Sequence, residues 1–173
     1  MSSVIIPLHG LSRGCQNFDF QLDGSFLEDF GHEVVEDVDC VAEFAVSRES
    51  DWISVECNVR GKVKVICDRC LEDLFLPVAA QEKLTVRFDA DWENVVNDDD
   101  NVIILPEGVS EVDLGQAVYD FICLSLPLIK AHPEGECNPD AISFIGTGEG
   151  DSQVENTPFG ALKDMIESKT NNK

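Results

Sequence analysis

Four residues of this 173-residue chain have the types and the spacing of ligands for one metal ion. Cys67 and Cys70 form a Cys-x-x-Cys pair, which allows two thiolates from one turn to bind the same Zn²⁺. A structural zinc site is tetrahedral and needs two further ligands. His132 and Cys137, with four residues between them, form a second pair that can complete a Cys₂-His-Cys site. A turn of buried thiols without any metal is the other interpretation, and the sequence leaves both open.

The same Cys-x-x-Cys pair also occurs at dithiol redox sites. Such a site usually places its first cysteine at an exposed helix N-terminus within a βαβ unit. Here the pair lies between two segments of alternating apolar residues, which predict strands on both sides of it. We therefore expect a structural knuckle rather than a redox centre. The four other cysteines have apolar neighbours and are predicted to be small core residues: Cys15, Cys40, Cys57 and Cys123.

The charge of the chain is strongly acidic, with 34 Asp and Glu residues against 12 Lys and Arg residues and a net charge of -22. A surface of this sign repels nucleic acid, because neutralising phosphates requires Lys and Arg. It attracts basic partners and keeps the chain in solution. An acidic surface with no partner is the alternative interpretation.

One segment departs from this balance. Between positions 60 and 87 there are six basic and four acidic residues, a net charge of +2, so the remainder carries -24. A small positive patch on a negative body can steer one RNA site onto one face. A solvated sheet face without a partner is the alternative. The six candidate contact residues are Arg60, Lys62, Lys64, Arg69, Lys83 and Arg87.

Hydrophobic periodicity predicts an α+β fold. Apolar residues alternate with polar ones through the centre of the chain, which favours an antiparallel, curled or partly closed β-sheet. One main helix is expected over about 111–125, followed by Pro127 as a stop. Arg60-Gly61 is predicted to be a turn. The five central strands are expected over residues 41–46, 53–59, 63–65, 74–78 and 84–88.

Composition also predicts the domain organisation. Residues 1–145 are expected to form a single α+β domain, and residues 146–156 an acidic Gly/Ser linker. Residues 157–169 are predicted to be an amphipathic helix that docks on the domain through its apolar stripe. Residues 89–101 contain six acids and no base and are predicted to be a loop, whose role in function the sequence leaves open.

Several classes of protein are not expected. The chain has no apolar run near the roughly 20 residues of a membrane span, and its start lacks the pattern of a signal peptide, so we expect a cytoplasmic protein without a membrane partner. It has no phosphate loop, nucleophile elbow or HExxH motif. We therefore predict no enzymatic activity, no small-molecule substrate and no organic cofactor.

The order of several short motifs resembles that of the YceD family, described as large ribosomal RNA subunit accumulation proteins. The resemblance covers roughly residues 1–166. It rests on Cys67-Asp68-Arg69-Cys70-Leu71 after an alternating strand, the helix from Asp113-Leu114 through Leu124-Ser125-Leu126-Pro127-Leu128, the pair His132 and Cys137, and Pro158-Phe159 with Leu162.

The resemblance implies a non-enzymatic factor that supports accumulation of the large-subunit ribosomal RNA. The family's Cys-x-[RK]-Cys motif matches Cys67, Arg69 and Cys70, and its later Cys/His segment matches His132 and Cys137. The expected partners are large-subunit ribosomal RNA, a basic ribosomal protein, or both. Two alternatives stay open: a zinc-stabilised adaptor that binds only protein, and a Cys-x-x-Cys redox protein.

Overall fold

The computed structural model describes residues 3–11, 14–31, 34–95 and 99–145. The chain divides into two compact units, residues 1–137 and 138–173. Every candidate ligand and every candidate contact cation belongs to the first unit. In the second unit the structure describes one short helix, α2 (Pro139–Ile145). The predicted linker 146–156 and the predicted C-terminal helix 157–169 lie outside the described residues, and the domain division stays a prediction.

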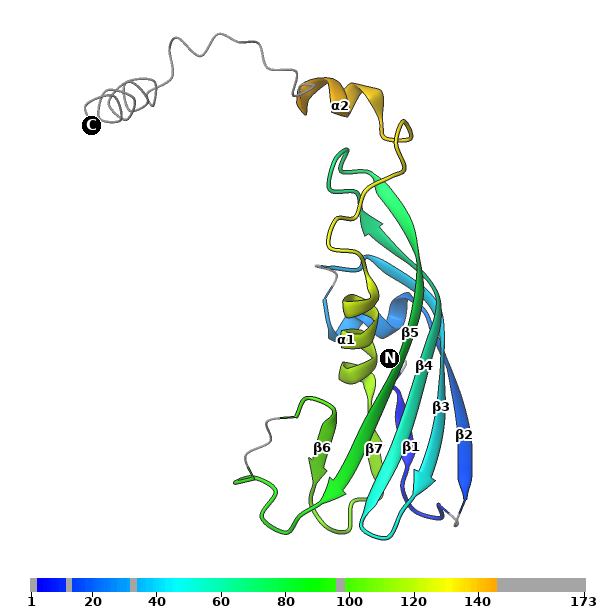
Figure 1. Ribbon diagram of the computed structural model, residues 1–173, viewed down its shortest axis with the longest axis vertical. Coiled ribbons are helices and arrows are strands. Elements are labelled where there is room, and N and C mark those ends of the chain that lie inside the picture. Colours follow the sequence, from blue (N-terminus) through cyan, green and yellow to red (C-terminus); the bar gives the residue numbers. More distant parts are fainter. Residues whose placement is uncertain (1–2, 12–13, 32–33, 96–98, 146–173) are drawn as a thin grey trace, which may run out of the picture. The chain divides into compact units, whose positions relative to one another are not determined.

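The first unit contains seven strands and two helices among its described residues (Figure 1). In chain order they are β1 (Ile5–Pro7), β2 (Cys15–Leu22), the 3-10 helix η1 (Gly24–Asp29), β3 (Asp37–Arg48), β4 (Trp52–Ile66), β5 (Asp73–Phe88), β6 (Val102–Leu105), β7 (Glu111–Asp113) and α1 (Gly115–Ser125).

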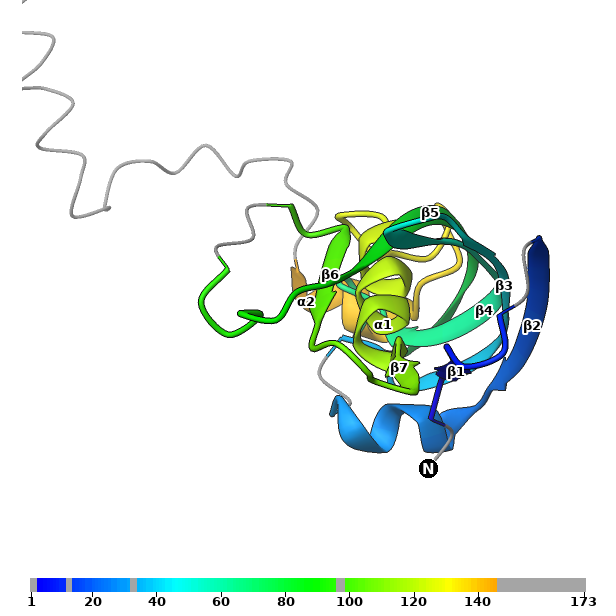
Figure 2. The same ribbon diagram turned by 90° about the horizontal axis from the view of Figure 1, so that it is seen from below.

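The main sheet has five strands in the order β2-β3-β4-β5-β6. The first four are antiparallel, whereas β6 runs parallel to β5. The sheet is therefore mixed and open, with β2 and β6 at its edges. Seen from below, the long strands bend around α1 (Figure 2). The α+β class is confirmed, and the predicted central strands are antiparallel. The sheet is not closed, and the parallel edge strand β6 makes it mixed.

The central strands are longer than predicted. β4 has 15 residues and β5 has 16, and each joins two runs that the sequence predicts as separate strands. The predicted turn at Arg60-Gly61 is wrong, because Gly61 pairs with Cys40 of β3 and Val78 of β5 in an unbroken ladder. Gly61 has φ +153, and a Cβ atom there would lie 2.2 Å from the carbonyl oxygen of Asp39. Glycine at this position allows the close approach of the neighbouring strand and marks no turn.

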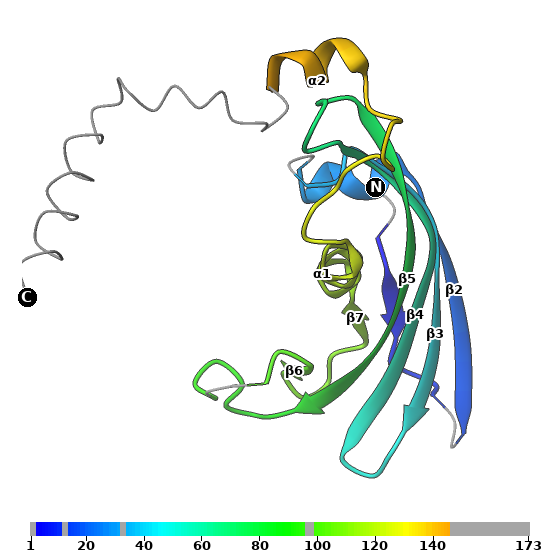
Figure 3. The same ribbon diagram turned by 45° about the horizontal axis from the view of Figure 1, so that its top comes forward.

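The hydrophobic core lies on one face of the main sheet. α1, η1 and the small sheet of β1 and β7 all cover that face (Figure 3). Every second residue of β4 from Ile53 to Val65 is buried there except Gly61, including Val55, Val59 and Val63. On the helix side the core is closed by Leu114, Val118, Phe121 and Ile122, and η1 adds Phe26 and Leu27. The other face of the sheet is exposed and carries the polar residues of each alternating strand.

The main helix begins later than predicted. Glu111–Asp113 do not form its first turn, because they pair with β1 as strand β7. α1 starts at Gly115, whose N–H donates to Oδ1 of Asp113 at 2.8 Å. Two cysteines also differ from prediction. Cys40 and Cys57 are buried as expected, but Cys15 is exposed at the first residue of an edge strand, and Cys123 is half-buried.

Candidate metal centre

The structure brings the four predicted ligands together. The ligand atoms of Cys67, Cys70, His132 and Cys137 all lie within 4.8 Å of one another. Sγ of Cys67 is 3.9 Å from Sγ of Cys137, and Nδ1 of His132 is 3.4 Å from Sγ of Cys70. In a tetrahedral zinc site with Zn–S of about 2.3 Å and Zn–N of about 2.0 Å, ligand atoms lie about 3.5–3.8 Å apart. The cluster thus has the donor set and nearly the spacing of a structural Cys₃His zinc site.

The Cys67–Cys70 turn is fixed by backbone hydrogen bonds at the end of β4. The N–H of Cys67 donates to the carbonyl of Glu72, and the N–H of Leu71 donates to the carbonyl of Cys67, both at 2.9 Å. Leu71 has φ +59, a left-handed conformation that is uncommon outside glycine. The chain accepts this conformation where the turn must bring two thiols to the same side.

The segment after α1 is tied to this turn by a second set of contacts. The N–H of Asp68 donates to the carbonyl of Lys130 at 2.6 Å, and the N–H of Lys130 donates to Oδ2 of Asp68 at 2.7 Å. Nη2 of Arg69 donates to the carbonyl of His132 at 2.9 Å. These contacts bring His132 to the cysteines although 62 residues separate it from Cys70.

The orientation of the imidazole suits ligation through Nδ1. Nε2 of His132 lies 3.1 Å from the carbonyl oxygen of Asp73, which can only accept a hydrogen bond. A proton on Nε2 leaves the lone pair of Nδ1 facing the sulfur atoms. A backbone carbonyl in this position is a usual outer partner of a metal-binding histidine.

The electrostatics favour a thiolate at Cys67. Burial by itself would raise the pKa of this thiol, but hydrogen bonds from the backbone N–H groups of Cys70, His132 and Arg69 outweigh it and lower the pKa to about 6. A hydrogen bond with Cys67 raises the pKa of His132, and burial raises the pKa of the Cys137 thiol. Such a stabilised thiolate is what a metal ligand requires.

A lowered thiol pKa is also the property expected of a redox cysteine. The solvent exposure of the thiols therefore decides between metal ligation and redox exchange. Cys67 has no exposed surface, and Cys70 is 6% exposed. A dithiol that exchanges with a substrate must reach it. The geometry therefore favours ligation over redox exchange.

The six candidate contact cations do not form one patch. Alternation along β4 and β5 puts five of them on the outer face of the sheet, with Arg60, Lys62 and Lys64 toward one end and Lys83 and Arg87 toward the other. Lys83 on β5 is paired with Glu56 on β4. Arg60 lies four residues further along β4 than Glu56, which places it about 13 Å from that pair. Arg69 is not on this face, because its guanidinium holds the His132 carbonyl in the knuckle.

Acidic side chains pair with three of these six cations. Lys62 pairs with Asp39 at 3.6 Å and Lys83 with Glu56 at 3.6 Å. Lys64 lies 3.0 Å from Asp73 and 3.2 Å from Glu36, and these partners raise its pKa. Among the described residues, Arg60 and Arg87 form no ion pair.

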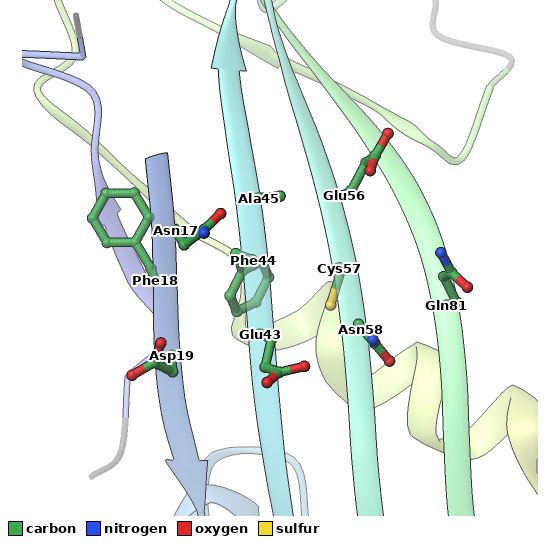
Figure 4. Close-up of a pocket in the computed structure, with 10 residues that line it drawn as sticks. All are labelled: Asn17, Phe18, Asp19, Glu43, Phe44, Ala45, Glu56, Cys57, Asn58 and Gln81. Carbon is green, nitrogen blue, oxygen red and sulfur yellow. The ribbon is translucent and has the colours of Figure 1, made fainter. Parts of the chain in front are cut away.

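The middle of the outer face is acidic. It holds a shallow pocket of about 360 Å³, whose lining includes the carboxylates of Asp19, Glu43 and Glu56 together with neutral amides (Figure 4). Asp19 and Glu43 are direct cross-strand partners, so like charges face each other. No Lys or Arg is among the described residues that line this pocket. Sequence reasoning missed it, although its signal was present as the polar positions of the alternating strands.

The fold and the cluster define a class of protein: an α+β protein with an open sheet, whose candidate centre is a set of four ligands fit for structural zinc. The chain belongs to the YceD family, since a family model described as large ribosomal RNA subunit accumulation protein YceD matches residues 55–165. The matched range contains all four ligands and all six candidate cations. The chain matches no curated protein and no solved structure. Within the described ranges, no helix has the length and apolar character needed to span a bilayer.

Proposed function

We propose that the protein is a non-enzymatic cytoplasmic factor that supports large-subunit ribosomal RNA accumulation by binding a basic ribosomal protein. The family description supplies the process. The observation that carries the choice of partner is the pairing of Lys62, Lys64 and Lys83 with carboxylates. Three of the six candidate cations are thus paired, and the net charge of -22 leaves an acidic surface that attracts cations and repels phosphates.

The metal centre has a structural part in this proposal. Zinc held by Cys67, Cys70, His132 and Cys137 would join the end of β4 to the segment that follows α1. Structural zinc contributes folding free energy directly. The metal centre needs no role in binding a substrate, because the thiols of Cys67 and Cys70 are buried.

Affinity purification at two salt concentrations tests the choice of partner. At about 50 mM salt the tagged protein should enrich large-subunit ribosomal proteins, and the enrichment should fall at about 300 mM salt, because added ions screen exposed charges. Enrichment that is absent at low salt would contradict the proposal. A nuclease treatment before purification distinguishes direct protein binding from capture through RNA.

A second candidate contact is RNA, favoured by the two outer-face cations that form no ion pair in the described structure. Arg60 and Arg87 both lie on the outer face of the sheet. Replacing both by Glu should weaken RNA crosslinking while the fold is retained. Arg48→Glu is the matched control. Arg48 is exposed at the end of β3, but it falls in phase with the buried residues of that strand and not with those of the outer face. Crosslinking that is unchanged by the double substitution would reject RNA contact here.

The two other hypotheses make different predictions. An adaptor that binds only protein should carry stoichiometric zinc and give no RNA crosslink. A redox protein should show turnover in a dithiol assay, which the burial of Cys67 and Cys70 argues against.

A further inference from the structure

A second surface of the first unit has the form of a peptide-binding groove. It lies between α1 and β6, and its volume is about 550 Å³, within the range of about 300–1,000 Å³ common to binding pockets. Its floor includes Leu84, which is 1% exposed, and its rim includes Leu124, which is 82% exposed. Its lining includes the apolar residues Ile103, Ala117, Phe121 and Leu124 and the acidic residues Asp100, Asp113 and Asp120.

The groove follows from how α1 packs. Val118 and Ile122 face the core and are fully buried. Ala117, Phe121 and Leu124 are spaced four and three residues apart, so they form a neighbouring stripe on the same helix. On the far side, Ile103 of β6 faces the groove, and β6 is the edge strand next to β5. Phe121 is only 7% exposed, so the apolar surface that α1 leaves open comes mainly from Leu124, with half-buried Ala117 beside it.

The rim of the groove has one sign of charge. Asp100, Asp113 and Asp120 are exposed, and no Lys or Arg is among the described lining residues. Oδ1 of Asp120 accepts a hydrogen bond from Gln116 at 2.9 Å, and Oδ1 of Asp113 accepts one from the N–H of Gly115, which fixes both carboxylates beside the apolar stripe. An apolar floor with anionic edges is complementary to a segment with an apolar stripe flanked by cations.

We infer that this groove binds a basic amphipathic peptide segment of the protein's partner, with apolar side chains on Ala117, Phe121 and Leu124 and Lys or Arg residues at the acidic rim. This inference rests on the proposed function, to which it adds the site and the kind of segment that is recognised. A second copy of the chain is disfavoured, because its own groove would bring carboxylates against carboxylates.

The chain's own C-terminal segment is also a weaker occupant. Residues 157–169 carry apolar residues at helical spacing, but their two lysines are matched by Asp164 and Glu167, so their side-chain charges cancel. A segment of net zero charge does not use the anionic rim.

The test measures binding of a fluorescein-labelled synthetic peptide, two repeats of Leu-Lys-Lys-Leu-Leu-Lys-Leu, to the full chain by fluorescence anisotropy. Leu124→Glu and Asp120→Lys should each raise the Kd about tenfold or more, because one removes an apolar contact and the other reverses a rim charge. The matched controls are Phe75→Glu, at an exposed residue on the outer face of the sheet, and Asp51→Lys, at an exposed turn. The controls should change the Kd by less than about threefold.

Equal weakening by groove and control variants would mean general charge attraction and would overturn the inference, as would failure of the wild-type chain to bind the peptide. A gain in affinity on replacing Leu162 and Ile166 by Ser would assign the groove to the chain's own C-terminal segment and would also overturn it.

A parallel purification of ribosomal proteins separates this inference from the proposed function. If Leu124→Glu retains large-subunit proteins as well as the wild type does, the groove assignment fails and the proposed function stands. If the wild type retains none, the proposed function fails, whatever the peptide result. Loss of large-subunit proteins from Leu124→Glu, with retention by Phe75→Glu, supports both.

Discussion

At the residue scale, the cluster depends on side chains that never reach the ligand atoms. Asp68 accepts the N–H of Lys130 and also lies 3.9 Å from the ammonium group of the same residue. Arg69, one of the six predicted contact residues, donates a hydrogen bond to the carbonyl of His132. These two residues of the Cys-x-x-Cys loop therefore position the second half of the site. The spacing of the cysteines in the sequence carries no sign of this role.

Asp68→Ala should weaken zinc binding about tenfold, in line with the usual effect of removing an outer partner of a metal site. The reason is that the segment carrying His132 loses its side-chain anchor on the knuckle. Competition with a chromogenic chelator measures the affinity. Asp51→Ala, at an exposed turn, is the control, and equal affinities of the two variants would contradict the positioning role.

Cys57 makes a separate prediction about pH. Burial, with a smaller contribution from the Glu82 carboxylate, raises the pKa of this thiol from 9.0 to about 12. The thiol therefore stays protonated in the folded state while the unfolded chain releases its proton. Its contribution to stability is complete below about pH 9 and is lost as pH rises toward about 12.

Over that interval the free energy of unfolding should fall by up to about 1.4 kcal/mol per pH unit through this one group. Cys57→Ala should remove that part of the slope, and Cys15→Ala, at an exposed thiol, should not. Urea unfolding from pH 8 to 11 measures it. Identical slopes for the wild type and Cys57→Ala would show that the thiol is not buried as described.

At the element scale, the long ladder of β3, β4 and β5 depends on Gly61. Gly61→Ala should destabilise the protein by about 3 kcal/mol or more, since the new methyl group meets the Asp39 carbonyl, and the backbone must also relax from a positive φ. Gly10→Ala is the control, because Gly10 has φ +83 but no atom within 4 Å of an added Cβ. It should cost about 1 kcal/mol. Similar losses in chemical denaturation would assign the whole effect to backbone strain.

The same elements show what the sequence could predict. Alternation located the strand residues and their buried face, because one-sided burial imposes period two. It could not distinguish a turn at Arg60-Gly61 from a glycine inside a strand, since both use the same residue. It also placed Glu111–Asp113 in a helix. Their acids suit a helix start, but pairing with β1 prevails, and only the tertiary structure shows that partner.

The candidate site was predicted unevenly for a similar reason. Cys67 and Cys70 were visible as a local motif, and His132 and Cys137 were suggested as the second pair; the structure brings all four together. The six cations were counted along the chain. Lys62 and Asp39 are 23 positions apart in the sequence, but they face each other on the adjacent strands β4 and β3. Charge pairing across a sheet is a property of register, which a local count does not contain.

At the scale of the whole molecule, the protein combines a basic segment with three paired cations, an acidic outer face and a candidate metal centre whose ligands come from two distant parts of the chain. In the proposed binding factor of ribosome assembly, the fold presents charge and a bound metal would keep the segment after α1 in place. We expect one zinc ion to be bound jointly by Cys67, Cys70, His132 and Cys137.

Metal analysis of the purified protein, with thermal unfolding of the same samples, tests whether the four residues share one ion. We predict one zinc per wild-type chain, its loss from both Cys67→Ser and Cys137→Ser, and a lower Tm in both variants. Cys15→Ser should keep the zinc and the wild-type Tm, because Cys15 is exposed and is not a member of the cluster. A wild-type protein without zinc, or loss of zinc from only one of the two cluster variants, would contradict the shared site.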